Sequence, residues 1–134
     1  LARMYGYVYQ MTDTKYTIIH NLDGYDEVSL TAPFKMISRH KEELIEPRRL
    51  GLDTLHPQDI VGGSDVKQSA EIFENILSGK GTRAQEQVVS ANAGVALQIL
   101  HPEKSLIDCV EISMEALKNG QANACFQKLI ELNK

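Results

Sequence analysis

The chain has 134 residues, of which 43% are hydrophobic and 24% charged, an ordinary composition for one globular domain with its own core. Fourteen basic residues stand against eighteen acidic ones, and the longest basic run is the pair Arg48 and Arg49. This balance argues against a nucleic-acid or membrane-surface role, because affinity for phosphate groups comes largely from clustered positive charge. The apolar stretches are shorter than the roughly 20 residues that a membrane-spanning helix needs, so we expect a soluble protein.

The N-terminus does not look like the start of a complete chain. The segment from Leu1 to Tyr5 begins without Met and lacks the charged start, apolar middle and cleavage site of a signal peptide. We therefore expect residues 1–134 to form a single piece of a longer protein.

Cys109 and Cys125 lack metal-ligand spacing, so we expect both to be buried, reduced thiols, which fits a cytoplasmic protein.

The N-terminal third predicts a sheet of short strands. The segment from residue 1 to residue 10 is ambiguous, because its apolar spacing suits a helix while its alternating tyrosines suit a strand. Four short apolar, partly β-branched runs then follow, separated by turn residues, and His40 and Lys41 suggest a hairpin between the last two. The expected strands are 16–20, 28–31, 34–38 and 42–46.

Residues 47–63 contain prolines and glycines that predict an irregular connection. It is not a domain linker, because it keeps apolar residues that we expect to pack on the fold: Leu50, Leu52, Leu55, Ile60 and Val61.

The second half predicts packed helices. An amphipathic pattern follows Ser64 and ends at Gly79, and a capping box at Thr82 begins a helix that reaches about Leu100. Apolar residues occupy nearly the whole circumference of that helix, which predicts that it is buried all round. Two further helices are expected, from Ser105 to Gly120 and around residues 122–130. The expected fold class is α/β, with a partial sheet of short strands followed by a bundle of packed helices.

The most suggestive stretch for chemistry runs from the strand ending at His20 into an acidic turn. Asp26 and Glu27 can converge only if the backbone bends, which Gly24 allows. Two carboxylates suit Mg²⁺, which takes one or two protein carboxylates and completes its coordination with water and substrate phosphates. The alternative is a solvated acidic turn.

Other polar residues favour structural roles. Ser64 or Asp65 is expected to cap the following helix, in preference to a phosphate loop around Gly62 and Gly63. His20 is expected to be a strand-end residue with an exposed tip. The amide of Asn92 is expected to bond to nearby backbone, and Tyr5, Tyr7 and Tyr9 to be core or interface aromatics.

The segments Ile18 to His20 and Asp23 to Ser29 resemble the strand, loop and Gly-hydrophobic-Asp-Glu signature of anthranilate phosphoribosyltransferases. The resemblance continues, in the expected order, through nearly the whole chain. It departs at Arg48 and Arg49, where the family has acidic residues. The further matching segments are Pro47 to Leu52, Gly62 to Asp65, Ala70 to Ile72, Leu77 to Gly81, Asn92 with Ala93, and Gly120 to Ala122.

The resemblance implies the large domain of nucleoside phosphorylase and phosphoribosyltransferase-like enzymes. It implies transfer of phosphoribosyl from phosphoribosyl pyrophosphate to anthranilate in tryptophan biosynthesis, with Mg²⁺ bound by Asp26 and Glu27. The family's phosphate loop, its anthranilate-binding Arg and its helical domain for homodimer formation match no part of these 134 residues. We therefore expect no catalytic residue here, no activity from this piece alone and possible self-association. Alternatives are a pyrimidine nucleoside phosphorylase-like enzyme and a non-catalytic relative that binds nucleic acid.

Overall fold

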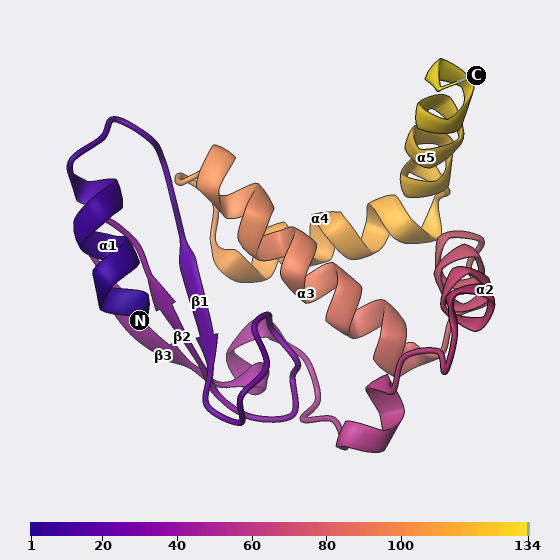
Figure 1. Ribbon diagram of the computed structural model, residues 1–134, viewed down its shortest axis with the longest axis horizontal. Coiled ribbons are helices and arrows are strands. Elements are labelled where there is room, and N and C mark those ends of the chain that lie inside the picture. Colours follow the sequence, from indigo (N-terminus) through magenta and orange to yellow (C-terminus); the bar gives the residue numbers. More distant parts are fainter. Residues whose placement is uncertain (134) are drawn as a thin grey trace.

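The computed structural model describes residues 1–133 as a small antiparallel sheet, an irregular connection and four consecutive helices, preceded by one N-terminal helix (Figure 1). In chain order the elements are α1 Ala2–Gln10, β1 Ile18–Asn21, β2 Phe34–Ile37, β3 Glu42–Ile45, the 3₁₀ turns Pro47–Leu50 and Pro57–Ile60, α2 Val66–Leu77, α3 Arg83–Leu100, α4 Leu106–Lys118 and α5 Gln121–Leu132. The expected α/β class, with strands first and packed helices after, is confirmed.

The three strands form one antiparallel sheet in the order β1-β2-β3. Asn21 pairs with Phe34 and Phe34 with Ile45, so the end of β1 is tied through β2 to the end of β3. A tight turn joins β2 to β3, where the Ser38 N–H donates to the Lys41 carbonyl at 2.8 Å, as the expected hairpin requires. The loop from Leu22 to Pro33 joins β1 to β2.

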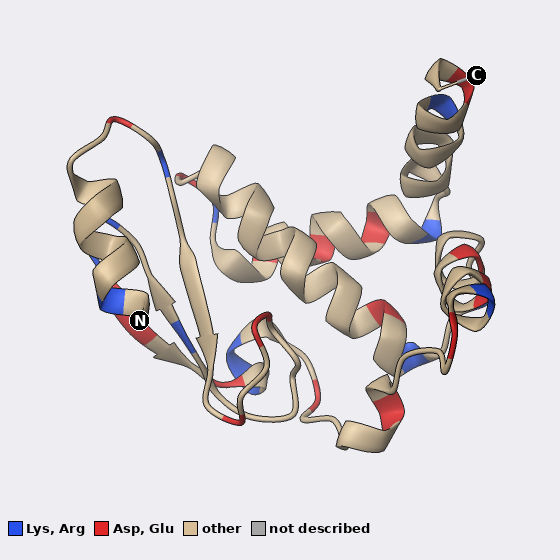
Figure 2. Ribbon diagram, in the orientation of Figure 1, with Lys and Arg blue, Asp and Glu red and all other residues tan. Residues whose placement is uncertain are grey.

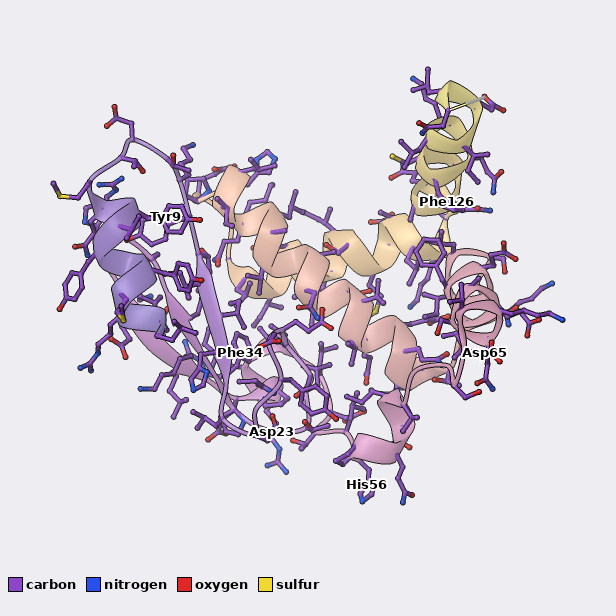
Figure 3. All side chains as sticks on the ribbon, in the orientation of Figure 1. Tyr9, Asp23, Phe34, His56, Asp65 and Phe126 are labelled. Atoms are coloured by element: carbon purple, nitrogen blue, oxygen red, sulfur yellow. The ribbon has the colours of Figure 1, made fainter. Side chains whose placement is uncertain are left out.

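The hydrophobic core lies between the sheet and the crossed pair α3 and α4. Phe34 is fully buried at its centre (Figure 3), and the connection after β3 contributes Leu50 and Leu52. The other buried members are Val28, Leu30, Ile45, Ala91, Val95 and Val110. Burying this set stabilises the fold by roughly 1.5 to 3 kcal/mol for each large side chain.

Helices α3 and α4 cross at very short range. A Cβ atom on Gly94 would lie 2.6 Å from Val110 Cγ2 and 2.8 Å from its Cα. Only a residue without a side chain fits there, and the close approach lets both helices present their apolar faces to the core. A capping box begins each of them, at Thr82 and at Ser105.

Helix α1 is attached to the sheet mainly by polar contacts and one aromatic stack. The Arg39 guanidinium donates to the carbonyls of Gln10, at 3.0 Å, and of Thr12, so it closes the C-terminal end of the helix. Tyr9 stacks on Tyr16 with ring centroids 5.2 Å apart. Tyr5 and Tyr7 are exposed, so they do not pack in the core, and a role at an interface stays a prediction.

Helices α2 and α5 lie beyond the α3 and α4 pair, on the side away from the sheet (Figure 1). Phe73 of α2 meets Phe126 of α5 edge to face, with centroids 4.9 Å apart. Cys125 on α5 is exposed while Cys109 on α4 is buried, so the expectation of two buried thiols is confirmed only for Cys109.

Two further expectations need correction. Residues 28–31 do not form a strand, because their backbone groups bond to side chains of Asn92 and Ser29 and to Leu55 instead of to a neighbouring strand. Helix α3 is not buried all round, since the side chains of Val89 and Leu100 are exposed. In the connection, Val61 is also exposed. No helix within residues 1–133 is long and apolar enough to cross a membrane.

Candidate metal-binding loop

The loop that carries the predicted acids leaves β1 at the end of the sheet, where Asp23 marks its first turn (Figure 3). Gly24 adopts φ 96°, a left-handed conformation that glycine tolerates without cost, and this turns the chain out of the strand. Asp26 and Glu27 then follow in a bend and are exposed. The bend that the sequence required for these two carboxylates is present.

The base of the loop is closed by a network of four polar side chains. Asn21, buried at the end of β1, donates through Nδ2 to Asp23 Oδ1 at 2.5 Å and to Ser29 Oγ. Ser29 Oγ lies 2.6 Å from Thr31 Oγ1, and the Thr31 hydroxyl also donates to Asp23 Oδ2. Both oxygens of Asp23 are therefore used in holding the loop together.

Two backbone anchors fix the C-terminal arm of the loop. The amide of Asn92 on α3 accepts from the Val28 N–H at 3.0 Å and donates to the Val28 carbonyl at 2.8 Å. The Leu55 N–H donates to the Leu30 carbonyl at 2.9 Å. Leu30 has φ 62°, unusual for a residue with a side chain, and its complete burial holds it there.

Asp26 and Glu27 differ from Asp23 in having no hydrogen bond or ion pair to any other residue in the part of the chain that the structure describes. Their four oxygens face solvent at the tip of an anchored loop. Hard oxygen donors of this kind match the preference of Mg²⁺, and two carboxylates leave positions for water and phosphate oxygens. Within residues 1–133 no cluster of three potential metal ligands occurs, so any metal ion here would take its remaining ligands from elsewhere.

The other polar candidates have structural explanations. Asp65 is the N-cap of α2, because its Oδ1 accepts from the Gln68 N–H at 2.8 Å, as expected. Gly63 packs so closely that a Cβ would lie 2.4 Å from the Ser69 nitrogen, which explains the glycine without a bound phosphate. His20 is exposed on β1, and His56 (Figure 3) caps a 3₁₀ turn through Nδ1.

Sequence reasoning found the two exposed acids and the backbone-bonding role of Asn92, but it missed the network below them. Asn21, Ser29 and Thr31 gave no signal as a group, because each is an ordinary loop or strand residue by itself. The short, partly β-branched run from Val28 to Thr31 also suggested a strand. Only the fold shows that these residues meet.

The sequence profile described as "Glycosyl transferase family, a/b domain" matches residues 1–123. The chain belongs to this family. Two curated relatives are the anthranilate phosphoribosyltransferases of Cytophaga hutchinsonii, 46% identical over 131 residues, and of Flavobacterium johnsoniae, 47% identical over 133 residues. These alignments cover 98% and 99% of this chain but only 40% of each relative, so the chain spans well under half the length of those proteins.

Solved structures give the same fold. The anthranilate phosphoribosyltransferase of Thermus thermophilus matches with a TM-score of 0.86 at 19% identity, over 95% of this chain and 38% of that one. The Saccharomyces cerevisiae enzyme in complex with phosphoribosyl pyrophosphate and magnesium matches with a TM-score of 0.84, also at 19% identity, over 97% and 38%. The chain therefore resembles the α/β domain portion of anthranilate phosphoribosyltransferases.

Proposed function

We propose that this chain is the C-terminal part of an anthranilate phosphoribosyltransferase, which transfers phosphoribosyl from phosphoribosyl pyrophosphate to anthranilate with release of pyrophosphate. The similarity to curated enzymes of that name over nearly the whole chain supports this activity. The observation that carries the proposal is the exposed pair Asp26 and Glu27, held at the tip of an anchored loop and not engaged by other side chains.

In this proposal Asp26 and Glu27 bind Mg²⁺ that accompanies the pyrophosphate group. A cation held by these two carboxylates would neutralise negative charge that develops on the pyrophosphate as its bond to C1 of the ribose breaks. Asp23 does not bind the metal, because both of its oxygens already accept hydrogen bonds from Asn21 and Thr31. Its role is to shape the turn that presents the other two acids.

The charge distribution favours a small-molecule enzyme over a nucleic-acid-binding relative. Figure 2 shows the Lys and Arg residues spread over the elements with acidic residues between them, and Arg39, Arg49 and Arg83 each contact a backbone carbonyl or a carboxylate. This spread offers little of the concentrated positive potential on which binding of a phosphate backbone depends. The partners we propose are anthranilate and phosphoribosyl pyrophosphate, in a cytoplasmic homodimer of the longer protein.

Self-association of the 134-residue chain belongs to the same proposal. Apolar side chains are exposed along α1, α3 and α5, and a groove of about 450 Å³ between α3 and α4 is lined by Val89, Leu100 and Ile112 among others. Exposed apolar surface of this kind favours association with a second copy when nothing else covers it.

The test is magnesium-dependent loss of anthranilate fluorescence in the complete protein that carries this sequence. The double variant Asp26→Asn, Glu27→Gln should lower the rate roughly 100-fold or more, because metal stabilisation of a leaving phosphate is worth several kcal/mol. Asp13→Asn, Glu111→Gln, which changes two exposed acids outside the loop, is the matched control. The purified 134-residue chain should be inactive.

Three results would contradict the proposal. Full activity of the double variant would remove the metal role, and turnover by the isolated chain would show that the missing part is not needed. A complete protein that is inactive towards anthranilate but cleaves a pyrimidine nucleoside with phosphate would instead be a nucleoside phosphorylase.

A further inference from the structure

We propose that Asn92 is a positioning residue for the metal-binding acids: its amide on α3 fixes the backbone from which Asp26 and Glu27 project. The inference rests on the proposed function, since it concerns the same loop. It assigns a role in metal affinity to a helix residue that does not itself contact the metal.

The geometry is a two-point clamp. Asn92 Oδ1 accepts from the Val28 N–H at 3.0 Å while Asn92 Nδ2 donates to the Val28 carbonyl at 2.8 Å. One side-chain amide thus satisfies both backbone groups of a single residue, which is the pairing a neighbouring strand would otherwise supply. The two residues are 64 positions apart in the chain.

The orientation of the clamp is set by the helix. The second hydrogen on Nδ2 donates to the Val88 carbonyl, one turn earlier in α3, at 2.9 Å. Both amide hydrogens and the oxygen of Asn92 therefore have partners, and the side chain cannot rotate without losing all three bonds. Aspartate has nearly the same shape, but it would place a negatively charged oxygen against two carbonyl oxygens.

The clamp affects the two acids because it fixes the backbone of the residue that follows them. Val28 follows Glu27 directly, and its side chain is fully buried. Between Gly24 and Val28 the described chain shows no other hydrogen bond, so the path of Asp26 and Glu27 depends on its two fixed ends. One end is the network of Asn21 and Asp23, and the other is the clamp.

Loss of the clamp should loosen the ligands without opening the loop. The bond from Leu55 to Leu30 and the contacts among Asn21, Ser29 and Thr31 remain, so the fold should persist. Groups that orient metal ligands typically change metal affinity roughly 10- to 100-fold when they are removed. The expected effect is therefore on magnesium affinity more than on the maximal rate.

The experiment titrates Mg²⁺ in the complete protein with phosphoribosyl pyrophosphate and anthranilate present, and measures the initial rate. For Asn92→Ala and the near-isosteric Asn92→Asp, the half-saturating Mg²⁺ concentration should rise roughly 10- to 100-fold, with most of kcat recovered at saturating Mg²⁺. At neutral pH the half-saturating Mg²⁺ concentration should rise more for Asn92→Asp than for Asn92→Ala.

Two controls separate positioning from general loss of stability. Val95→Ala removes buried volume from the same helix and from the core cluster that contains Val28, but leaves every hydrogen bond of the clamp in place, and Asn75→Ala removes an exposed helical amide. Both should leave the half-saturating concentration unchanged, and urea denaturation ranks the variants by stability. Asn92→Ala, which places no charge against the two carbonyl oxygens, provides the readout if Asn92→Asp does not fold.

The positioning role is overturned if both Asn92 variants keep the normal half-saturating concentration, or if Val95→Ala shifts it equally. Those results would leave the metal role of the acids intact, provided that the Asp26→Asn, Glu27→Gln variant has lost its response to Mg²⁺. If that double variant responds normally to Mg²⁺, the proposed metal site itself fails.

Discussion

At the residue scale, neighbouring carboxylates take different roles according to what surrounds them. Asp23 accepts hydrogen bonds at both oxygens, whereas Asp26 and Glu27, three and four positions later, face solvent. Composition alone cannot make this distinction, because all three residues lie in one acidic turn. The decisive factor is the position of Asn21 and Thr31, which the pairing of β1 with β2 brings beside Asp23.

Glu43 on β3 provides a prediction about pH. Its carboxylate lies 2.8 Å from Lys41 Nζ and 3.5 Å from Arg49, and the hydrogen bond from Lys41 is the main cause of its lowered pKa. A carboxyl group whose pKa is lower in the folded state stabilises the protein above its unfolded pKa. That contribution is lost as pH falls through the folded pKa.

The variant Glu43→Gln should therefore lower stability near neutral pH, by at most about 1 kcal/mol because both cations are exposed, and should weaken the acid dependence of unfolding. Urea denaturation between pH 7 and pH 3 measures this difference. Glu42→Gln, which removes only a 3.5 Å contact with exposed Lys35, is the control. A constant difference between Glu43→Gln and the unmodified chain over that range would exclude the linkage.

At the element scale, the closest packing occurs where α3 crosses α4. Gly94→Ala should destabilise the chain by roughly 1 to 3 kcal/mol, because the new methyl group would overlap Val110, which is itself buried. This cost should exceed the gain of about 1 kcal/mol in helix propensity that alanine offers. The midpoint of urea unfolding, followed by circular dichroism, measures the difference.

Gly62→Ala is the control for that change, since a Cβ at Gly62 would have no neighbour within 4 Å and the residue does not lie in the left-handed region. Its stability should be unchanged or slightly higher, because alanine restricts the unfolded chain. If Gly94→Ala is as stable as Gly62→Ala, the two helices do not approach as closely as described.

The helices were predictable because their ends carry local signals. Asp65, Thr82 and Ser105 each accept a hydrogen bond from a backbone amide in the first turn, as the sequence indicated. Residues 28–31 were predicted wrongly as a strand, because Asn92, which determines their conformation, is distant in sequence. Local pattern identified the exposed acids, but it could not identify the side chains that hold their loop.

At the scale of the whole molecule, burial was harder to predict than secondary structure. Cys109 and Cys125 lie in similar helical patterns, yet only Cys109 faces the core. Part of the apolar surface of α3, at Val89 and Leu100, is exposed in this chain. Which face is covered depends on which elements are present, and the chain spans about 40% of the length of its curated relatives.

The unequal burial of the helices implies that the elements unfold locally at different free energies, and not all together. Helix α5 has no buried residue and α1 buries only Gly6, whereas α3 buries five residues and α4 three. Amide protons in α1 and α5 should therefore exchange with deuterium through small local openings, while those in the middle of α3 and α4 should exchange only through nearly global unfolding.

Hydrogen–deuterium exchange, followed by mass spectrometry of peptides, can measure this hierarchy. Equal protection in α3 and α5 would contradict it. Because Asn92 lies in the middle of α3, where slow exchange is expected, the clamp on Val28 should persist on the timescale of catalysis. The loop that carries the exposed acids would then be attached, through Asn92, to the helix that unfolds least often.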